Sequence, residues 1–257
     1  MEEIIKIDNV SFEVPNKKIL DNVSLKVLEK KRVGIIGPNG SGKTTLLKHV
    51  YRALPVNKKT IYINNKALED YTYKESAKAL TVVKQENSSD FDFTVKDIVL
   101  LGRAPYRKYF EEYTHEDIEI AEKALKSIGM VEFSNQSFNQ LSGGEKQRVL
   151  IARSLCQQAD IFILDEPTNH LDVYYQWSLI KMIKDLDATV LGVFHEFNLA
   201  SWFCDYIYVL DKGHVAYEGS PKQVFTKEII REIFKVDAEI VLKNENVQIL
   251  FNGAINI

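Results

Sequence analysis

The sequence predicts an α/β fold with a helical subdomain inserted into its core. Apolar strand patterns and helical patterns alternate towards both ends of the 257-residue chain, whereas the segment from about 85 to 157 is polar and rich in helix signals. A chain of this length buries roughly three-quarters of its unfolded surface, enough for one large domain with a subdomain. We find no internal repeat and no low-complexity segment. These observations favour a single α/β domain that carries one insertion.

The first elements have strand patterns. Apolar residues stand at every second position at 5–7, 10–14 and 25–27, which predicts strands with one buried face. Residues 32–36 then form a short apolar run that leads into a glycine-rich turn. A helix is expected from about Lys43.

Later elements carry clearer start and stop signals. Thr114 begins a capping-box pattern ahead of apolar residues at helical spacing, and Gly129 stands where that helix would end. Two apolar runs, 161–164 and 189–194, predict buried strands. Residues 211–213, Asp-Lys-Gly, predict the turn of a hairpin.

Composition limits the possible partners and compartment. The net charge of −3, from 33 basic and 36 acidic side chains, argues against general nucleic-acid binding. The two cysteines, Cys156 and Cys204, lack metal-site spacing and are expected to be buried packing residues in a reducing cytosol. The acidic N-terminus has no signal-peptide pattern, and no apolar run reaches about 18 residues. We therefore expect any membrane spans to come from another chain.

The glycine-rich turn is a phosphate-binding loop by pattern. Residues 37–44 fit G-x-x-x-x-G-K-[ST], with a strand pattern before and a helix pattern after. Glycines let backbone N–H groups surround a phosphate, and the helix start adds partial positive charge. Lys43 is expected to reach the β- and γ-phosphates, and the Thr44 hydroxyl to bind Mg²⁺. The predicted ATP-binding residues are Gly37, Pro38, Asn39, Gly40, Ser41, Gly42, Lys43, Thr44 and Thr45.

A second motif is the apolar strand 161–164, which ends in Asp165 and Glu166. Buried carboxylates need a compensating charge, and Mg²⁺ supplies one. Asp165 is expected to hold Mg²⁺, and Glu166 to polarise the attacking water as a general base. An ordinary strand end has the same pattern, but its position after a phosphate loop favours the catalytic interpretation.

The third motif is Leu-Ser-Gly-Gly-Glu at 141–145. Ser142 and Glu145 form a capping box, which alone predicts a helix start. Gly143 and Gly144 are not required by that box, and each weakens a helix by about 1 kcal/mol relative to Ala. Two glycines at a helix N-terminus indicate that an anionic group approaches the backbone closely.

Together these stretches resemble an ABC-type ATPase. The phosphate loop, residues 141–148 and residues 164–172 stand in the family's order across essentially the whole chain, and the combination is highly specific. The resemblance implies a P-loop NTPase fold of ABC type, with a RecA-like core, an antiparallel β subdomain and an inserted helical subdomain. It divides the chain into a core at 1–84 and 158–225, a helical subdomain at 85–157 and a C-terminal tail at 226–257.

The resemblance assigns further roles. Gln85 would contact Mg²⁺ and link its site to the helical subdomain, His195 would contact the γ-phosphate, and Asp172 would cross a dimer interface. Alone, a histidine at a strand end is more often structural. Two copies are expected to pack head to tail, with each ATP between one copy's phosphate loop and the other copy's signature residues. Those signature residues are Ser142, Gly143, Gly144 and Glu145.

Two positions depart from the family pattern. Glu145 replaces the commonest glutamine of the signature, a mild change that keeps the capping role. Val14, which is also expected to bind ATP, occupies the position of the expected adenine-stacking aromatic residue. Phe12 lies two residues earlier, and whether it substitutes is open at this point.

The branch of the family follows from residues 99–105, 168–172 and the end of the chain, which resemble importers of ferric siderophores, haem and cobalamin. This implies an ATPase that uses ATP and Mg²⁺ and is peripheral to the cytoplasmic face of the cell membrane. The implied partners are a second copy, an integral membrane permease and, indirectly, a substrate-binding protein, with no nucleic acid. The alternatives are soluble ABC ATPases, either ribosome-associated or active in iron–sulfur cluster assembly. The ribosome-associated branch normally has two cassettes and a charged linker, whereas this chain has one phosphate loop and one signature.

The segment after Gln85 is the expected permease contact. Phe91, Phe93 and Val95 alternate with polar residues there. Exposed aromatic residues commonly mark interaction sites. The alternative is that these side chains belong to the core.

Overall fold

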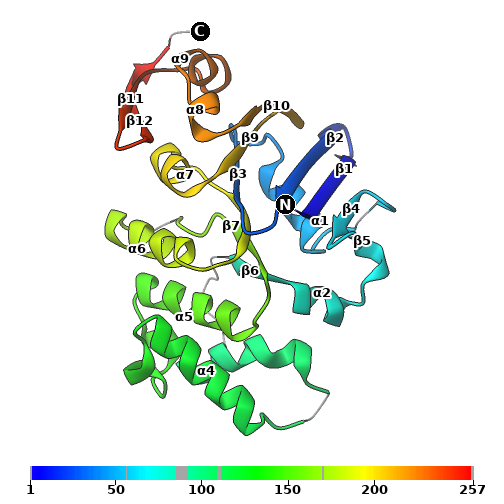
Figure 1. Ribbon diagram of the computed structural model, residues 1–257, viewed down its shortest axis with the longest axis vertical. Coiled ribbons are helices and arrows are strands. Elements are labelled where there is room, and N and C mark those ends of the chain that lie inside the picture. The colour runs from blue at the N-terminus through cyan, green and yellow to red at the C-terminus, as the bar shows by residue number, and fades with distance from the viewer. Residues whose placement is uncertain (1, 56, 85–91, 109–110, 170, 256–257) are drawn as a thin grey trace. The chain divides into compact units, whose positions relative to one another are not determined.

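The computed structural model describes residues 2–55, 57–84, 92–108, 111–169 and 171–255 of the chain. These residues form two compact units (Figure 1). Unit 1 comprises residues 1–70 and 187–257, and unit 2 comprises residues 71–186. Among the described residues, no helix is both long enough and apolar enough to cross a membrane.

Unit 1 contains an antiparallel sheet with the strand order β2-β1-β4-β5. Its strands are β1 (Glu3–Val14), β2 (Lys17–Leu28), β4 (Ile61–Ile63) and β5 (Lys66–Ala67), followed by the turn η1 (Leu68–Asp70). Ile5 pairs with Val27 and Ile7 with Leu25, and all four side chains are buried. The predicted period of two is therefore confirmed at these positions. It does not hold through residues 10–14, where Val10 is buried but Val14 is 41% exposed.

The second sheet region of unit 1 is mostly parallel. It consists of β3 (Arg32–Ile36), β8 (Thr189–Val193), β9 (Tyr206–Asp211) and β10 (His214–Gly219). β3 pairs in parallel with β8 and β9, and β10 pairs antiparallel with β9 across the predicted hairpin. These parallel strands are continuous apolar runs because both of their faces are covered. The helices of this part are α1 (Lys43–Val50) and α7 (Phe197–Phe203).

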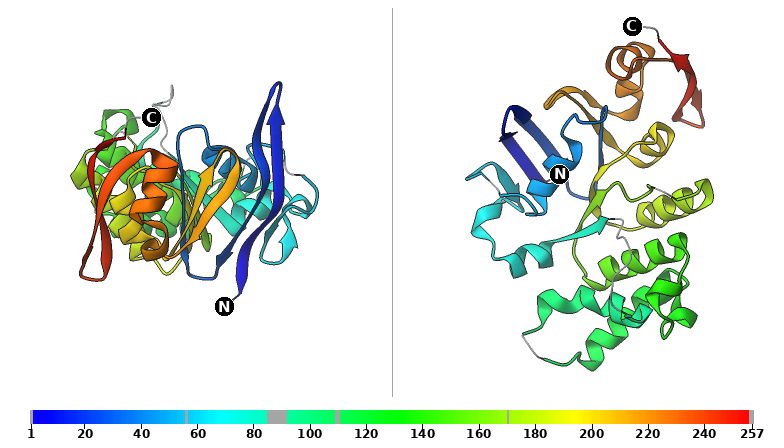
Figure 2. Two further views of the ribbon diagram at one scale, coloured as in Figure 1. Left: turned by 90° about the horizontal axis from the view of Figure 1, so that it is seen from above. Right: turned by 180° about the vertical axis from the view of Figure 1, so that it is seen from behind.

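The chain ends in a small α/β segment, also in unit 1. It contains α8 (Pro221–Val224), α9 (Lys227–Ile229), the π-helical turn η5 (Ile230–Phe234), β11 (Val236–Lys243) and β12 (Asn246–Ala254). β11 and β12 form an antiparallel hairpin, drawn in red in Figures 1 and 2. Phe197 of α7 contacts the rings of Phe225, Phe234 and Phe251, which anchors this segment to α7.

Unit 2 combines two parallel strands with the predicted helices. The strands are β6 (Leu80–Lys84) and β7 (Ile161–Asp165). The helices are α2 (Tyr73–Ala79), α3 (Val95–Leu100), η2 (Leu101–Tyr106), α4 (His115–Ser127), η3 (Val131–Phe133), η4 (Phe138–Gln140), α5 (Gly143–Cys156) and α6 (Val173–Lys184). The capping box predicted at Thr114 is present at the start of α4.

A buried ion pair joins η2 to α4. Arg103 Nε lies 2.8 Å from Asp117 Oδ1, and both side chains are less than one-tenth exposed. Asp117 also accepts hydrogen bonds from the N–H and hydroxyl groups of Thr114. Burial acts to raise the pKa of the Asp117 carboxyl, but the hydrogen bonds from Arg103 and Thr114 outweigh it, so the pKa is lowered.

The two cysteines are free and buried, as predicted. Burial raises the pKa of the Cys156 thiol to about 12, so this thiol is a packing group and not a nucleophile at neutral pH. The predicted boundaries of core, helical subdomain and tail remain a prediction.

Candidate nucleotide site

The phosphate loop in unit 1 begins directly after β3, whose side chains are almost entirely buried. Gly37, Gly40 and Gly42 all have positive φ angles, of 155°, 77° and 103°. A Cβ at Gly37 would lie 2.0 Å from the carbonyl oxygen of Leu210, and one at Gly42 would lie 2.9 Å from that of Ile19. Only glycine fits these two positions, so the loop closes tightly against its neighbours.

Lys43 lies within this loop. Its Nζ donates hydrogen bonds to the carbonyl oxygens of Gly37 (2.8 Å) and Pro38 (2.9 Å). The side chain is buried, with a relative exposure of 5%. The ammonium group is therefore held against the loop backbone.

The start of α1 is open to an anion. Its N-cap is Gly42, so no side chain caps the helix, and the first turn carries no acidic residue. Thr44 and Thr45, both half-buried, occupy that turn. Ser41 is buried, and its hydroxyl has no hydrogen-bond partner within the described residues. A helix start without a side-chain cap and a buried hydroxyl are features that suit the binding of a phosphate group.

His195 follows β8 at the same end of the sheet as the phosphate loop. β3 and β8 are parallel, with Ile35 opposite Val193, and the N–H of Phe194 donates to the carbonyl of Ile35 (3.1 Å). Gly37 and His195 each follow their paired residue by two positions, so they leave the sheet at the same level. His195 is exposed.

Val14 and Phe12 differ in their surroundings. Val14, the last residue of β1, is 41% exposed. The half-buried ring of Phe12 instead packs edge-on against His49 of α1, with ring centroids 4.9 Å apart. Since Phe12 is engaged with the protein's own helix, Val14 leaves an accessible position without an aromatic ring.

In unit 2, the acidic motif lies at the end of β7. Asp165 is 4% exposed and pairs in register with Lys84, the last residue of β6. Glu166 follows in the left-handed region, with a φ of 52°. Gln85 comes directly after Lys84 in the sequence but lies outside the described residues.

Sequence reasoning missed Asn169. Its side-chain amide donates to Glu166 Oε2, and its N–H donates to the Glu166 carbonyl (3.3 Å). The signal was an asparagine three residues after the proposed base, a spacing at which a turn returns the chain to its start. Asn169 therefore fixes the orientation of the Glu166 carboxylate.

The signature turn contains the predicted capping box. Ser142 is the N-cap of α5, and its N–H and hydroxyl both donate to Glu145 Oε2, at 2.8 and 2.6 Å. These hydrogen bonds lower the pKa of the Glu145 carboxyl. Glu145 thus holds the turn in place.

The two signature glycines serve different purposes. Gly143 is exposed, and a Cβ built there would meet no atom within 4 Å. Gly144 is buried, and a Cβ there would lie 2.5 Å from the ring of Tyr175 on α6. Packing against Tyr175 accounts for Gly144, so the predicted approach of an anion is needed to account for Gly143 only.

Asp172 has a role within its own chain. It is the N-cap of α6, and its Oδ1 accepts the N–H of Tyr175 (3.1 Å). The ring of Tyr175 also faces Arg148 of α5, whose guanidinium carbon lies 5.5 Å from the ring centroid. Tyr175 therefore connects the residue predicted to cross the dimer interface with the signature helix.

The predicted permease segment is only partly described. Phe91 lies outside the described residues. Phe93 is 38% exposed, and its carbonyl accepts the N–H of Phe138 (2.9 Å). Val95, the first residue of α3, is fully buried, so the alternative of a core position is confirmed for it.

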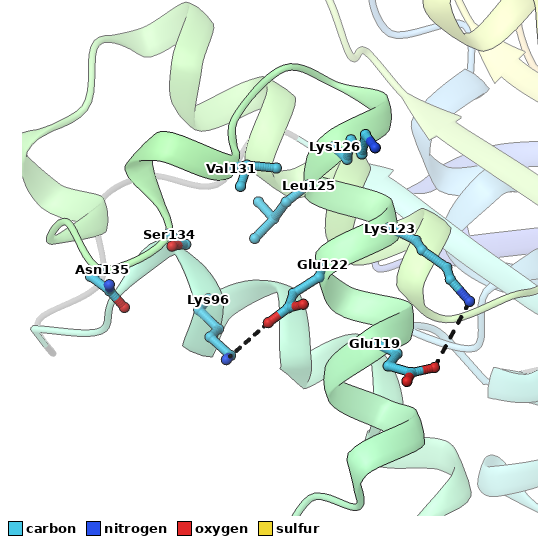
Figure 3. Close-up of a pocket in the computed structure, with 9 residues that line it drawn as sticks. All are labelled: Lys96, Glu119, Glu122, Lys123, Leu125, Lys126, Val131, Ser134 and Asn135. Carbon is cyan, nitrogen blue, oxygen red and sulfur yellow. Dashed lines mark ion pairs between the residues drawn. The ribbon is translucent and has the colours of Figure 1, made fainter.

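A separate hollow of unit 2 lies between α3, α4 and η3 (Figure 3). Lys96 pairs with Glu122 at 3.6 Å, and Lys123 lies 4.0 Å from Glu119. None of the predicted nucleotide-site residues lines it. Because glutamates pair with two of its lysines, it lacks the concentrated positive charge of a phosphate site.

Comparison with known proteins gives consistent matches. The profile of the ABC transporter family matches residues 20–169. The iron(3+)-hydroxamate import ATP-binding protein FhuC of Bacillus subtilis is 34% identical over 88% of this chain and 86% of its own length. The hemin import ATP-binding protein HmuV of Pseudoalteromonas translucida is 32% identical over 91% of this chain and 93% of its own. An uncharacterized ABC transporter ATP-binding protein of B. subtilis, YvrA, is 37% identical over 91% of this chain, which spans 54% of that protein.

Solved structures give the same fold. The ADP conformation of the ATP-binding cassette MJ1267 superposes with a TM-score of 0.81 at 23% identity, over 91% of this chain and 98% of that chain. A dimeric, post-hydrolysis state of the cassette MJ0796, bound to ADP and Pi, gives a TM-score of 0.71 at 29% identity, over 84% and 98%.

Proposed function

This chain belongs to the ABC transporter family as one of its ATP-binding, ATP-hydrolysing proteins, and we propose that it powers a membrane importer for ferric siderophore, haem or cobalamin-type molecules. The observation that carries the proposal is the similarity to FhuC and HmuV, each over about nine-tenths of this chain. Both names describe import of an iron compound. Neither soluble alternative is supported by a comparable match among these relatives.

In this proposal, the nucleotide phosphates bind at residues 37–45. The φ angles of Gly37, Gly40 and Gly42, the uncapped start of α1 and the buried Ser41 hydroxyl support that assignment. Lys43 would exchange its two loop carbonyls for phosphate oxygens. Val14 would lie beside the base without stacking on it.

The residues proposed for Mg²⁺ are Thr44, Gln85 and Asp165. A hydroxyl, an amide and a buried carboxylate are oxygen donors of the kind that Mg²⁺ takes together with substrate phosphates. When bound, Mg²⁺ would neutralise charge on the β- and γ-phosphates. Glu166, oriented by Asn169, would accept a proton from the attacking water, and His195 would contact the γ-phosphate.

The proposed partners are a second copy of this chain and an integral membrane permease, with a substrate-binding protein acting indirectly. The dimeric state of the MJ0796 cassette supports the first partner, and the import names of FhuC and HmuV support the second. The signature residues Ser142, Gly143, Gly144 and Glu145 would face the nucleotide of the second copy, and Asp172 would cross the dimer interface. The proposed location is the cytoplasmic face of the membrane, peripheral to the permease.

The experiment is a growth assay coupled to a pull-down. The gene for this chain is deleted in its host, and growth is measured on ferric hydroxamate, hemin or inorganic iron as the sole iron source. We expect a defect on one chelated source that the wild-type gene rescues and Lys43→Ala does not, with a polytopic membrane protein co-purifying. Equal growth on every source, with ribosomes or iron–sulfur assembly proteins co-purifying, would favour the soluble alternatives.

A further inference from the structure

The two outer edges of the C-terminal hairpin differ in whether their backbone groups have hydrogen-bond partners. On β12, the N–H of Ile249 donates to Asn198 Oδ1 (2.8 Å), and the Ile249 carbonyl accepts from Asn198 Nδ2 (3.2 Å). The Ser201 hydroxyl donates to the carbonyl of Val247 (2.7 Å). Asn198 and Ser201 both belong to α7. Helix α7 therefore satisfies the outer edge of β12.

The outer edge of β11 is open. Ile240 is opposite Ile249, Leu242 is opposite Val247, and Ala238 is opposite Phe251. In an antiparallel pair, opposed residues point their backbone groups either towards each other or both outwards. Since those of Ile249 point to α7, the N–H and C=O groups of Ala238, Ile240 and Leu242 point away from β12. Within the described part of the chain, none of these groups has a hydrogen-bond partner.

An apolar groove of about 540 Å³ runs beside this open edge. Its lining includes Phe225, Ala238, Ile240 and Leu242, with Lys227 also among the lining residues. Leu242 is 65% exposed, whereas Ile240 is half-buried. Exposed edges are normally protected by lysine or proline, and residues 238–242 contain neither.

The sequence of β11, Val-Asp-Ala-Glu-Ile-Val-Leu-Lys, is complementary to itself. If two copies run antiparallel about Ile240, Asp237 of each faces Lys243 of the other. Ala238, the smallest side chain of the edge, then faces Leu242 of the other copy. In this register Ile240 of one copy forms a hydrogen-bonded pair with Ile240 of the other. Residues 238 and 242 lie two positions away on either side, so their outward N–H and C=O groups also pair across the interface.

We propose that the outer edge of β11 is a self-association surface, at which the C-terminal hairpins of two copies join into one four-stranded antiparallel sheet. Leu242 of each copy enters the groove of the other, beside Ala238. The occupant is a second copy because, when two β11 strands run antiparallel, an acidic residue faces a basic one and a small side chain faces a large one. This contact uses none of the residues proposed to bind ATP, so it is independent of the nucleotide.

The first test is sedimentation velocity without nucleotide, in a Lys43→Ala background that cannot form an ATP-held pair. The chain is expected to dimerise as its concentration rises. Leu242→Lys is expected to weaken that association at least tenfold, because it replaces an apolar side chain that enters the other copy's apolar groove with a charged one. Its melting temperature should not change, since the side chain is exposed. The control is Val131→Lys, another exposed apolar position, in unit 2, which should leave the dimer intact.

The second test is a cross-link at the symmetry axis. Cα atoms of a hydrogen-bonded antiparallel pair lie about 5.5 Å apart, within the range of a disulfide. Ile240→Cys should therefore form a disulfide-linked dimer under mild oxidation, whereas Lys243→Cys, far from the axis, should not. A monomer at every concentration overturns the proposal, as does equal cross-linking of the two variants. The proposal is also overturned if the β11 edge binds a strand of a different protein but never that of a second copy.

Discussion

The ring of Tyr175 lies against Gly144 so closely that no side chain fits between them. A Cβ at position 144 would be 2.5 Å from the ring. The same tyrosine donates its N–H to Asp172. This contact joins the signature turn and the start of α6 within one copy, before any second copy binds.

We expect Gly144→Ala to damage both stability and turnover. The added methyl group overpacks the contact with Tyr175, at a cost of about 1–3 kcal/mol. Gly143→Ala is the matched control, because its Cβ would point into open space and alanine is the better helix former. Thermal melts should therefore separate the two variants. ATPase assays then test the role of Gly143. If the nucleotide of a second copy approaches Gly143 closely, Gly143→Ala should lose activity without losing stability. Equal melting temperatures for both variants would contradict the packing role of Gly144.

Glu166→Gln is expected to bind ATP and nearly lose hydrolysis. The amide keeps the shape of the side chain but cannot accept the proton, a loss of roughly 10²–10⁴-fold in rate. The variant should elute as an ATP-dependent dimer on gel filtration. Glu145→Gln is the control, since the amide oxygen still accepts from Ser142. Near-wild-type hydrolysis by Glu166→Gln would assign the base to another residue.

The head-to-tail arrangement can be tested with two variants that fail for different reasons. Lys43→Ala should lose ATP affinity, because the phosphate charge is no longer compensated. Ser142→Arg should still bind ATP as a monomer but obstruct the second copy. In a mixed dimer, one site combines both defects and the other has neither. ATP turnover and nucleotide occupancy, measured per dimer, should therefore show one intact site. Two equally damaged sites would rule out the shared-site arrangement.

Val14→Tyr is expected to tighten ATP binding by about 0.5–1.5 kcal/mol, provided that the new ring stacks on adenine. The position is 41% exposed, so the larger side chain is tolerated. Isothermal titration with ATP and GTP measures the gain and its base preference. Phe12→Leu is the comparison, and we expect it to leave affinity unchanged because Phe12 packs on His49. Unchanged affinity in Val14→Tyr together with a loss in Phe12→Leu would assign the base contact to Phe12.

Asp117→Asn should destabilise the chain by about 3–5 kcal/mol, because it leaves the buried Arg103 guanidinium without its counter-charge. The lowered pKa of Asp117 means that its contribution is fully present above the ordinary value of 3.8. It is lost as pH falls through the lower, folded-state pKa. Urea unfolding at pH 7 and below pH 4 should show the difference from wild type shrinking at the acidic end. Lys96→Ala, which breaks the solvent-exposed pair with Glu122, should cost about 0–1 kcal/mol.

Local patterns predicted most of the elements. The capping boxes at Thr114 and Ser142 are determined by residues three positions apart, and both are present. The strands at 32–36 and 161–165 were visible as apolar runs, since parallel strands are covered on both faces. The phosphate loop after the first of these strands and the Asp165–Glu166 pair at the end of the second were also recognisable from the sequence.

Contacts between distant positions were not predictable. Gly144 and Tyr175 are separated by the rest of α5, by β7 and by a loop, so the packing reason for that glycine required the three-dimensional structure. The same holds for the Lys43 side chain, whose loop partners depend on the φ angles of three glycines. The open edge of β11 could not be foreseen either, because it depends on which strand α7 covers.

The left-handed backbone of Glu166 has an evolutionary consequence. A non-glycine residue held at a φ of 52° costs on the order of 1–3 kcal/mol, and glycine would relieve that cost. Replacing the proposed base by glycine should therefore yield a sturdier protein that no longer turns over ATP. Selection for thermal stability alone would favour glycine at this position. The glutamate is therefore retained for its activity, at a cost in stability.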